Sequence, residues 1–551
     1  MANLLLGPML RYVGRHDATI WVETDAPCEV EVLGHTRRTF SVAGHYYALV
    51  HVHGLEDGGT YPYEVRLDGT VAWPADDGRF PPSTIRTHGG MGPLRLAFGS
   101  CRIALPHEPP YTLTKDQDER GREIDALYAL TRRMVDQPAH EWPSLLLWVG
   151  DQVYADEISP GVRRLIEDRT PQERNHAPLD EVADFEEYCW LYWEAMGEDT
   201  IRWLLSNVPS AMIFDDHDVH DDWNTSGAWV AQIRRQPWWQ SRIEGAYMSY
   251  WIYQHIGNLT PRELADDEMW QRVRPGADLT DDLRDFARRA ERQVEGSRWS
   301  YSHDLGRTRL IVMDSRAGRV VDDDRHRRML DEREWEWIVD RATGDFDHLL
   351  LATSLPFLLA PGVHELEAWN EALCAGAWGQ RLRGPSEKLR QALDLEHWPA
   401  FHTSFEEVVE LLEEIASGRR GSPPATITFL SGDVHHAYLC EAALRRSVGA
   451  RSAVYQAVCS PYRNPLDSKE RRIMRAGWSR PAHAVAAALA RAAGVPAPPI
   501  RWRMVGEEPI FDNQVATLEL EDRSAQLRVE RTAVDDGNEP RLHESFHARL
   551  S

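Results

Sequence analysis

The chain has 551 residues, with 62 basic and 87 acidic side chains and a formal net charge of −25 at pH 7. So large an acidic excess repels the nucleic-acid backbone and anionic lipid surfaces, so we expect neither as a bulk partner. With 42% hydrophobic and 27% charged residues, the composition is that of a globular protein with a large core.

The cysteines and the N-terminus bear on the cellular compartment. Six cysteines are scattered without CxxC spacing or a dense framework, which is typical of reduced thiols. The start, MANLLLGPMLRYVG, has a three-leucine run without a basic flank, unlike a secretion signal. No stretch approaches the roughly 18 apolar residues of a membrane span. We therefore expect a cytoplasmic protein.

Residues 1–90 predict a small all-β domain. The segments ATIWVET, CEVEVLG, YALVHVHGL and YPYEVRLDG are short alternating runs separated by turn residues. Such a series is typical of a fibronectin-III or immunoglobulin-like sandwich. His51 and His53 alternate on one strand, but a third ligand is missing nearby, so we expect no metal site there.

Residues 95–500 predict an α/β domain, and residues 501–551 a β segment that completes its sheet. Compact apolar runs alternate with helical stretches, as in α/β proteins. Two long stretches, 158–200 and 225–300, are expected to be helical insertions that could form a lid. The segments VATLELE and AQLRVERTA return to a strand pattern near the C-terminus.

Four of the apolar runs end in side chains that can bind metals. Each motif alone is usually a turn or a helix cap, but all four follow buried-type strands. Sites in open α/β sheets assemble outside the carboxyl ends of the strands, so these side chains should meet in one metal site. The motifs are Gly99-Ser100-Cys101, Gly150-Asp151-Gln152-Val153-Tyr154, Asp215-Asp216-His217-Asp218 and Gly432-Asp433-Val434-His435.

The ligand types predict two neighbouring ions. A pocket of Cys101, Asp151, Tyr154 and His435 suits a strongly Lewis-acidic ion, because the thiol and the phenol must lose protons of high pKa. A harder pocket of carboxylates suits Ca²⁺, Mg²⁺ or Mn²⁺. It would consist of Asp216 and Asp433 with Asp221 or Asp222, and Asp151 would bridge the ions. Two ions about 3.5–4 Å apart form a clamp for displacement at phosphorus.

With these motifs the sequence resembles the PhoD-like alkaline phosphatases and phosphodiesterases of the metallophosphoesterase superfamily. The resemblance covers 95–470 and implies a metallophosphatase-type α/β (α+β) sandwich of β-sheets flanked by helices; the β domain ahead is similar to one that often precedes it. The matching stretches are FGSCR at 98–102, VGDQVYADE at 149–157, IFDDHDVHDDWN at 213–224, LIVMDSR at 310–316 and LSGDVHHAY at 430–438.

The resemblance also implies roles for single residues. Asp151 would bridge the metals, with Tyr154, Cys101 and His435 on the first ion. The second ion would be held by Asp216 and Asp433. His217 would contact the substrate phosphate and protonate the leaving oxygen. The implied metals are Fe³⁺ with Ca²⁺, while Mn²⁺, Mg²⁺ or Zn²⁺ stay open.

The sequence departs from the family where members often carry Asn-Asn. Asp221-Asp222 stands there instead. We expect Asp222 to bind metal, although Asp215 and Asp221 remain alternatives. An extra acid at this place adds negative charge to the second site.

Other charged residues near the motifs have two interpretations. Arg102 is assigned to the catalytic group, and Arg316 is a further candidate, because a guanidinium matches phosphate oxygens. A structural salt bridge explains either equally well. Asp314 is expected to accept hydrogen bonds, and the run 322–324 to form an exposed loop or a helix start.

Taken together, the motifs predict a dinuclear metal-dependent phosphoester hydrolase, a phosphomonoesterase and/or phosphodiesterase, whose nucleophile is a metal-bound hydroxide. The alternative is a non-catalytic metal- or ligand-binding protein on the same fold. A small phosphoester is the expected substrate. The acidic surface repels long polyanions, but it does not keep a small anion from a pocket filled with metal ions. The exact substrate, the metals and the oligomeric state stay open.

Overall fold

The computed structural model describes residues 1–74, 78–89, 92–321, 327–534 and 539–551. Its N-terminal part is a sandwich of two antiparallel four-stranded sheets, with orders β1-β2-β6-β5 and β4-β3-β8-β9. A third, two-stranded sheet pairs β7 with β10. The strands are β1 (Leu4–Val13), β2 (Asp17–Thr24), β3 (Glu29–Val32), β4 (His35–Arg38), β5 (Phe40–Val42), β6 (His45–His53), β7 (Thr60–Pro62), β8 (Val65–Leu67), β9 (Thr70–Trp73) and β10 (Thr84–Arg86). The predicted all-β domain is therefore confirmed.

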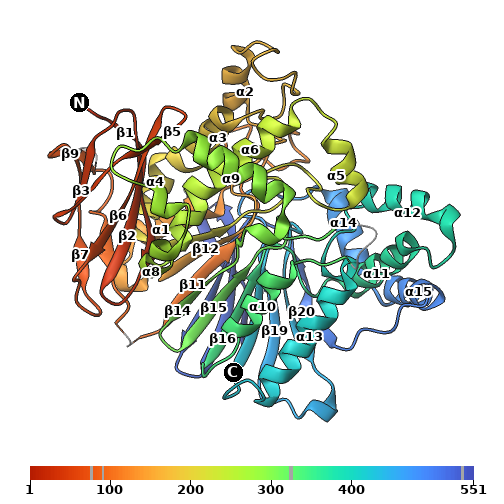
Figure 1. The fold of residues 1–551 in the computed structure, drawn as a ribbon. Helices are drawn as coiled ribbons and strands as arrows, with labels where there is room; N and C mark the ends of the chain where they lie inside the picture. The colour runs from red at the N-terminus through yellow and green to blue at the C-terminus, as the bar shows by residue number, and fades with distance from the viewer. Residues whose placement is uncertain (75–77, 90–91, 322–326, 535–538) are drawn as a thin grey trace.

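Two larger mixed sheets follow (Figure 1). One has the order β13-β12-β11-β21-β22-β23 and the other β14-β15-β16-β17-β19-β18-β20. Within them β11–β13 are parallel, and so are β15, β16, β17 and β19. Their bounds are β11 (Leu94–Gly99), β12 (Leu145–Val149), β13 (Ser210–Ile213), β14 (Tyr301–Leu305), β15 (Thr308–Met313), β16 (His348–Thr353), β17 (Thr426–Ser431), β18 (Ala437–Ala443), β19 (Ala453–Val458), β20 (Arg501–Ile510), β21 (Gln514–Glu521), β22 (Ser524–Val534) and β23 (Pro540–Arg549).

Alternation along the strands packs the two large sheets against each other. Leu350 and Ala352 of β16 point into a core that also holds residues of β11, β12 and β21. Leu349 and Leu351, on the opposite face of β16, pack with the helices outside. Because both faces are covered, the strands are continuous apolar runs such as LLLWV. The expected α/β sandwich flanked by helices is confirmed.

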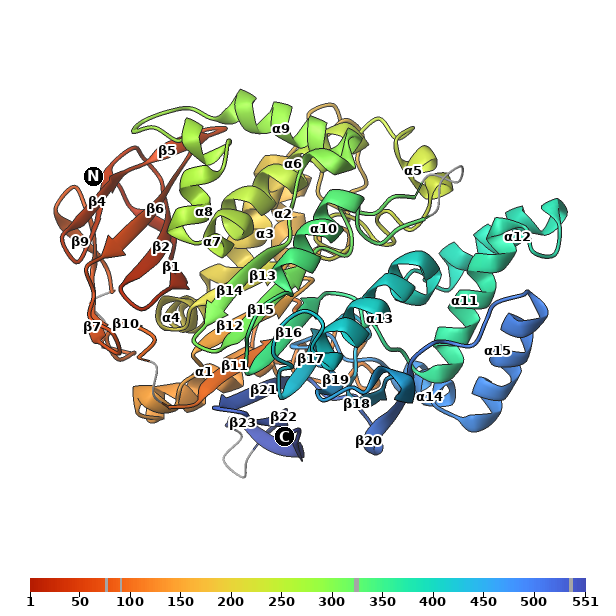
Figure 2. The same ribbon diagram turned by 60° about the horizontal axis from the view of Figure 1, so that its bottom comes forward.

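Helices cover the outer faces and fill the long connections (Figures 1 and 2). Helices α10 and α13 cover the seven-stranded sheet, while α11, α12 and α15 lie together beside its β20 end. The helices are α1 (Ala126–Asp136), α2 (Pro160–Glu167), α3 (Phe185–Gly197), α4 (Asp199–Asn207), α5 (Gly227–Ile233), α6 (Trp239–Ser249), α7 (Ile256–Asn258), α8 (Pro261–Asp266), α9 (Thr280–Arg292), α10 (Glu332–Arg341), α11 (Pro361–Ala375), α12 (Gln380–Ala392), α13 (His402–Ser417), α14 (Ser468–Gly477) and α15 (Arg480–Ala492).

A buried arginine ties the N-terminal sandwich to the rest of the molecule. Arg11 of β1 is 1% exposed. Its guanidinium donates to the carbonyl of Ser210 at 3.1 Å and to that of Gln254 at 2.8 Å. Gln254 lies in a π-helical turn, Tyr250–His255, whose wider winding leaves backbone carbonyls for such a donor. Within the described ranges, none of the helices combines the length and apolar character needed to cross a bilayer.

Candidate metal centre

The strand ends of the two large sheets meet at one edge. Cys101, which follows β11, donates from Sγ to Oδ2 of Asp151 after β12 at 3.3 Å, and to the carbonyl of Asp433 after β17 at 3.5 Å. Arg316 after β15 forms ion pairs with Asp216 after β13. Contacts between five separate strand ends therefore bring these motifs into one site, as expected for the carboxyl ends of strands in an α/β sheet.

The backbone is unusual at several of the positions predicted to bind metal. Cys101, Asp151 and Asp433 have left-handed φ angles of 56°, 52° and 64°. His435 and Asp222 also adopt this conformation, with φ of 51° and 61°. Non-glycine residues rarely adopt it, and such strain concentrates at functional sites.

Two glycines allow the strand ends to approach closely. A Cβ on Gly150 would lie 2.7 Å from Cβ of Asp215, and one on Gly432 would lie 2.1 Å from Oγ of Ser100. Both distances are too short for a side chain. The glycines that precede Asp151 and Asp433 are therefore required by packing, in addition to any turn preference.

The thiol, phenol and carboxylate expected on the first ion lie together. The Tyr154 hydroxyl donates to Oδ2 of Asp151 at 3.5 Å and accepts from Nδ2 of Asn464 at 3.2 Å. Burial and the neighbouring acids raise the pKa of the Cys101 thiol and of the Tyr154 phenol well above their usual ranges. Without a cation both groups hold their protons, and a strong Lewis acid would be needed to displace them.

Two groups of potential metal ligands have Asp216 in common. Asp151, Asp216 and His217 each offer one such atom within 4.8 Å of the others, and so do Asp215, Asp216 and Asp433. Burial raises the pKa of Asp151 well above its usual range and that of Asp215 to about 8. Crowded carboxylates with raised pKa values are destabilising unless a positive charge lies among them.

Arg316 supplies part of that charge. It is fully buried and donates to Asp215 and Glu396, and its Nη2 lies 3.1 Å from Oδ1 of Asp216 and 3.7 Å from Oδ1 of Asp433. One guanidinium cannot neutralise four carboxylates. Because these acids already occupy it, Arg316 fits the salt-bridge interpretation.

His217 is held by an acid of the second motif. Its Nδ1 lies 2.9 Å from Oδ1 of Asp156, and its ring stacks on Tyr154 with centroids 4.7 Å apart. Burial alone would lower the pKa of His217, but Asp156 and Asp216 raise it well above the usual range. Its Nε2, 4.0 Å from Oδ1 of the exposed Asp221, is then protonated and partly open to solvent.

His435 leaves its Nε2 atom available to a metal ion. Its Nδ1 lies 2.7 Å from the carbonyl oxygen of Asn464, which can only accept a hydrogen bond. Nδ1 therefore carries the proton, and Nε2 is left with a free lone pair suitable for a metal. Burial also lowers the pKa of His435, which favours this neutral form.

His397 is a residue of the site that the sequence analysis missed. Its Nε2 lies 3.0 Å from Oδ2 of Asp433, and its Nδ1 lies 2.8 Å from Oε1 of Glu367 on α11. Although burial alone would raise it, the hydrogen bond from His397 helps to lower the pKa of Asp433 to about 2. The surrounding sequence, LDLEHWP, contains no motif that pointed to this role.

The acids after β13 divide into structural and open carboxylates. Asp218 accepts from the backbone N–H groups of Asp151 and Asp215 at 3.0 and 2.9 Å, and so fixes both loops. Oδ1 of Asp222 is buried and has no hydrogen-bond partner among the described residues. Burial and nearby Glu396 raise the pKa of Asp222 to about 9. Oδ2 of Asp215 is likewise buried without a hydrogen-bond partner in the described residues, so both Asp215 and Asp222 keep an unused oxygen, whereas Asp221 is exposed.

Arg102 and Asp314 are used inside the fold. Arg102 is 2% exposed, and its Nε donates to Oδ2 of Asp125 at 2.7 Å. Asp314 accepts from the backbone N–H groups of Arg316 and Gly318, as expected. Because Asp125 already occupies its guanidinium, Arg102 fits the salt-bridge interpretation. The run 322–324 lies outside the described residues.

The donor set fits metal ions. Besides Asp222, Oδ1 of Asp151 is buried without a hydrogen-bond partner in the described part of the chain. Unsatisfied buried carboxylate oxygens are costly, and hard cations bind such oxygens. The thiol, phenol and imidazole groups beside them suit a strongly Lewis-acidic transition-metal ion, because thiolate is soft and imidazole is borderline.

Comparison with known proteins shows which family the chain belongs to. Residues 123–489 match the family described as PhoD-like phosphatase, which is well over half of the chain. The chain belongs to the PhoD-like phosphatase family. This PhoD-like protein also matches a domain of unknown function (DUF7800) over residues 1–85. The family match confirms the predicted family and supports a phosphoesterase. PhoD-like phosphatases are metalloenzymes, and the acidic and histidine groups described above could hold metal ions.

A solved structure described as "Structure of PhoD" has the same fold. Its TM-score is 0.58 at 13% sequence identity, and the match covers 99% of this chain and 92% of that one. At this identity the likeness concerns the fold alone. No curated protein matches the sequence.

Proposed function

We propose that this PhoD-like protein hydrolyses small phosphoesters at a dinuclear metal centre. Cys101, Tyr154, Asp151 and His435 would hold one ion, and Asp216, Asp433 and Asp222 with Asp151 would hold the other. Fe³⁺ with Ca²⁺ suits these donors, because thiolate and phenolate require a strong Lewis acid and carboxylates suit a hard ion. Bound there, such ions would polarise the phosphoryl oxygens. They would also lower the pKa of water, so that it loses a proton and can attack phosphorus.

The residues around the ions have separate tasks. His217 would donate the Nε2 proton to the leaving alcohol oxygen, while its Nδ1 stays hydrogen-bonded to Asp156. Asp156 would keep the imidazole ring oriented and favour its charged form. Arg316 would hold Asp215 and Asp216 in place as a buried counter-charge, without contacting the substrate.

One observation carries the proposal. The buried oxygens Asp151 Oδ1 and Asp222 Oδ1 lack partners in the described residues, and each lies beside a potential ligand group. A binding protein without catalysis would not need His217, whose protonated form is favoured by Asp156. We also propose that residues 95–500, with 501–551, form the catalytic part behind a separate domain of residues 1–90.

The first prediction concerns the bridging carboxylate. Asp151→Asn should lose at least one equivalent of metal and lower kcat/KM by a factor of about 1,000, because it weakens both ion sites and charge stabilisation at the transition state. Elemental analysis of the purified protein and assays with a chromogenic monoester and a chromogenic diester measure both effects. The relative rates of the two substrates assign the preference.

Asp285→Asn is the matched control, because Asp285 is an exposed acid of α9 with 66% side-chain exposure. It should keep full metal content and activity. A metal-free wild type, or full activity in Asp151→Asn, would contradict the proposed mechanism. Metal retention without hydrolysis of any phosphoester would favour a binding protein instead.

A further inference from the structure

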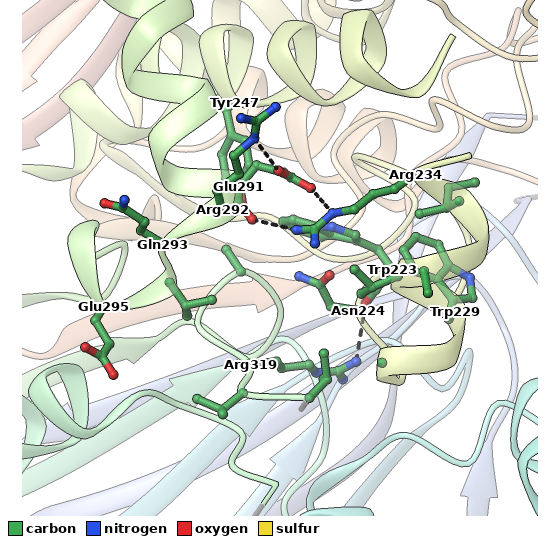
Figure 3. A pocket seen from close by; sticks show the side chains of 18 of the residues that line it. Trp223, Asn224, Trp229, Arg234, Tyr247, Glu291, Arg292, Gln293, Glu295 and Arg319 are labelled. Carbon is green, nitrogen blue, oxygen red and sulfur yellow. Dashed lines mark hydrogen bonds and ion pairs between the residues drawn. The ribbon is translucent and has the colours of Figure 1, made fainter. Parts of the chain in front are cut away.

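A cavity lies next to the candidate metal centre but is lined by other residues. It has a volume of about 760 Å³ and lies between α5, α6, the C-terminal end of α9 and the loop after β15 (Figure 3). Small-molecule sites commonly measure about 300–1,000 Å³. Among its described lining residues there is none of the proposed metal ligands. The cavity is therefore large enough for a ligand of its own.

Aromatic side chains form one side of this cavity. Trp223 and Tyr247, both labelled in Figure 3, pack edge to face with centroids 5.8 Å apart, and Trp229 and Trp239 also line the cavity. Trp229 and Trp239 pack edge to face with centroids 5.7 Å apart, which fixes both rings. Val230 of α5 adds an aliphatic surface. A flat or apolar group would find a rigid wall here.

Arginines predominate among the charged lining residues. Arg234 is paired with Glu291 at 2.6 Å, whereas Nε of Arg292 lies 3.9 Å from the same carboxylate. Arg333 is exposed, and its Nη1 donates to the backbone carbonyl of Glu295 at 3.4 Å. In the described part of the chain, no carboxylate lies within ion-pair distance of Arg333. The rim also carries the exposed Glu295, so Arg292 and Arg333 are the guanidinium groups least engaged by acids there, and such groups attract anions.

We propose that this cavity binds an organic anion that carries a flat ring. The ring would lie against the wall of Trp229 and Val230, and the charged group would meet the guanidinium groups of Arg333 and Arg292. A guanidinium binds planar oxyanions through two parallel hydrogen bonds, so a carboxylate, sulfonate or phosphate suits this rim. The inference goes beyond the proposed function and does not depend on it.

The cavity shares a wall with the metal centre. Trp223 and Asn224 line the cavity and directly follow Asp222. Arg319 donates to the carbonyl of Trp223 at 3.3 Å (Figure 3). The Asn224 amide donates to the carbonyl of Arg316 at 3.1 Å. The two sites are thus neighbours that use different side chains.

A ring sulfonate tests the site, because it is no phosphoester and cannot be hydrolysed. Naphthalene-1-sulfonate is titrated into the full-length protein by isothermal calorimetry. We expect one binding site and a Kd raised about tenfold in Arg333→Gln through loss of one charged contact. The Kd should rise by about tenfold or more in Val230→Trp, whose larger side chain takes the place proposed for the ring.

The controls separate this cavity from other surfaces. Arg235→Gln removes an exposed arginine outside the lining, and Val485→Trp adds a tryptophan at an exposed position of α15. Both should bind like the wild type. Unchanged affinity in Val230→Trp, equally tight binding of the neutral naphthalene-1-methanol, or no binding by the wild type would overturn the proposal.

Discussion

Single residues of the metal centre depend on partners that are distant in sequence. His397 orients Asp433 through one ring nitrogen and is itself held by Glu367 through the other. Hydrogen bonds of this kind fix the geometry of a ligand without touching the ion. The effect of losing such a partner should appear in metal affinity before it appears in folding.

His397→Gln tests this dependence. A glutamine cannot bridge Glu367 and Asp433 in the same geometry, so the second ion should bind about 10–100-fold more weakly. Titration of the chelated protein with metal measures the affinity directly, and excess metal should restore activity. His402→Gln changes a histidine with 41% side-chain exposure and should leave the affinity as it is. Equal metal affinity in both variants would rule out a positioning role.

Gly432 sets the approach between two strand ends. Gly432→Ala would place a Cβ against Ser100, and relief of that clash should cost about 1–3 kcal/mol of unfolding free energy. The same shift should displace Asp433 and reduce metal binding. Gly197, the last residue of α3, offers a matched control, since a Cβ there would lie at an ordinary contact distance of 3.7 Å from Cδ1 of Leu6. Gly197→Ala should be neutral or stabilise by about 0.5–1 kcal/mol in denaturant unfolding.

At the scale of elements, a histidine joins the N-terminal sandwich to the first helical connection. His45 of β6 lies 3.1 Å from Glu23 of β2 and 2.9 Å from Glu186 of α3. Burial alone would lower the pKa of His45, but contacts with Cys189, Glu186 and Glu23 raise it to about 12. The charged imidazole therefore stabilises the contact between these elements.

The pH dependence of this contact has a definite sign. The pKa of His45 is about 6.5 in the unfolded chain, so its contribution is complete below pH 6.5 and declines as the pH rises toward 12. His45→Asn should lower the unfolding free energy by about 1–3 kcal/mol at pH 6 and by less at pH 9. Denaturant unfolding at both values measures this difference. An equal loss at both values would contradict it, and exposed His51→Asn should change stability by less than about 0.5 kcal/mol.

At the scale of the whole molecule, the acidic excess is partly concentrated inside the protein. Asp215 and Asp222 have pKa values of about 8 and 9, mainly because burial disfavours their charged forms. Metal ions would remove this penalty. The remaining surface acids still disfavour long polyanions.

Chelated protein should become less stable as the pH rises. Between about pH 4 and 9 the folded chain holds protons on Asp215 and Asp222 that the unfolded chain has released, so unfolding becomes easier with increasing pH. The Tm of chelated wild type should fall from pH 6 to pH 9, and Asp222→Asn should show a smaller fall. Exposed Asp281→Asn is the control and should follow the wild type; equal slopes for all three would contradict this account.

Local sequence patterns were enough to predict the fold class and the family. The run YALVHVHGL identifies a strand, but only its second half alternates: Val52 is buried between the exposed His51 and His53, whereas residues 47–50 are all buried. Continuous runs such as LLLWV identify strands covered on both faces. The motifs that follow these strands are local as well, so the contact of Cys101 with Asp151 could be anticipated from parallel topology. Their metal-binding roles stay predictions.

Contacts between distant segments were decided only by the tertiary structure. His397 contacts Asp433 across 36 positions, and Arg316 contacts Glu396 across 80. Neither pair has a spacing that repeats with a helix or strand, because the intervening chain can take many paths. The partner of Arg102 is a further example, since a guanidinium suits a carboxylate and a phosphate equally well. Sequence thus determined which chemistry is present at the strand ends, while packing decided which charges are paired and which oxygens remain free.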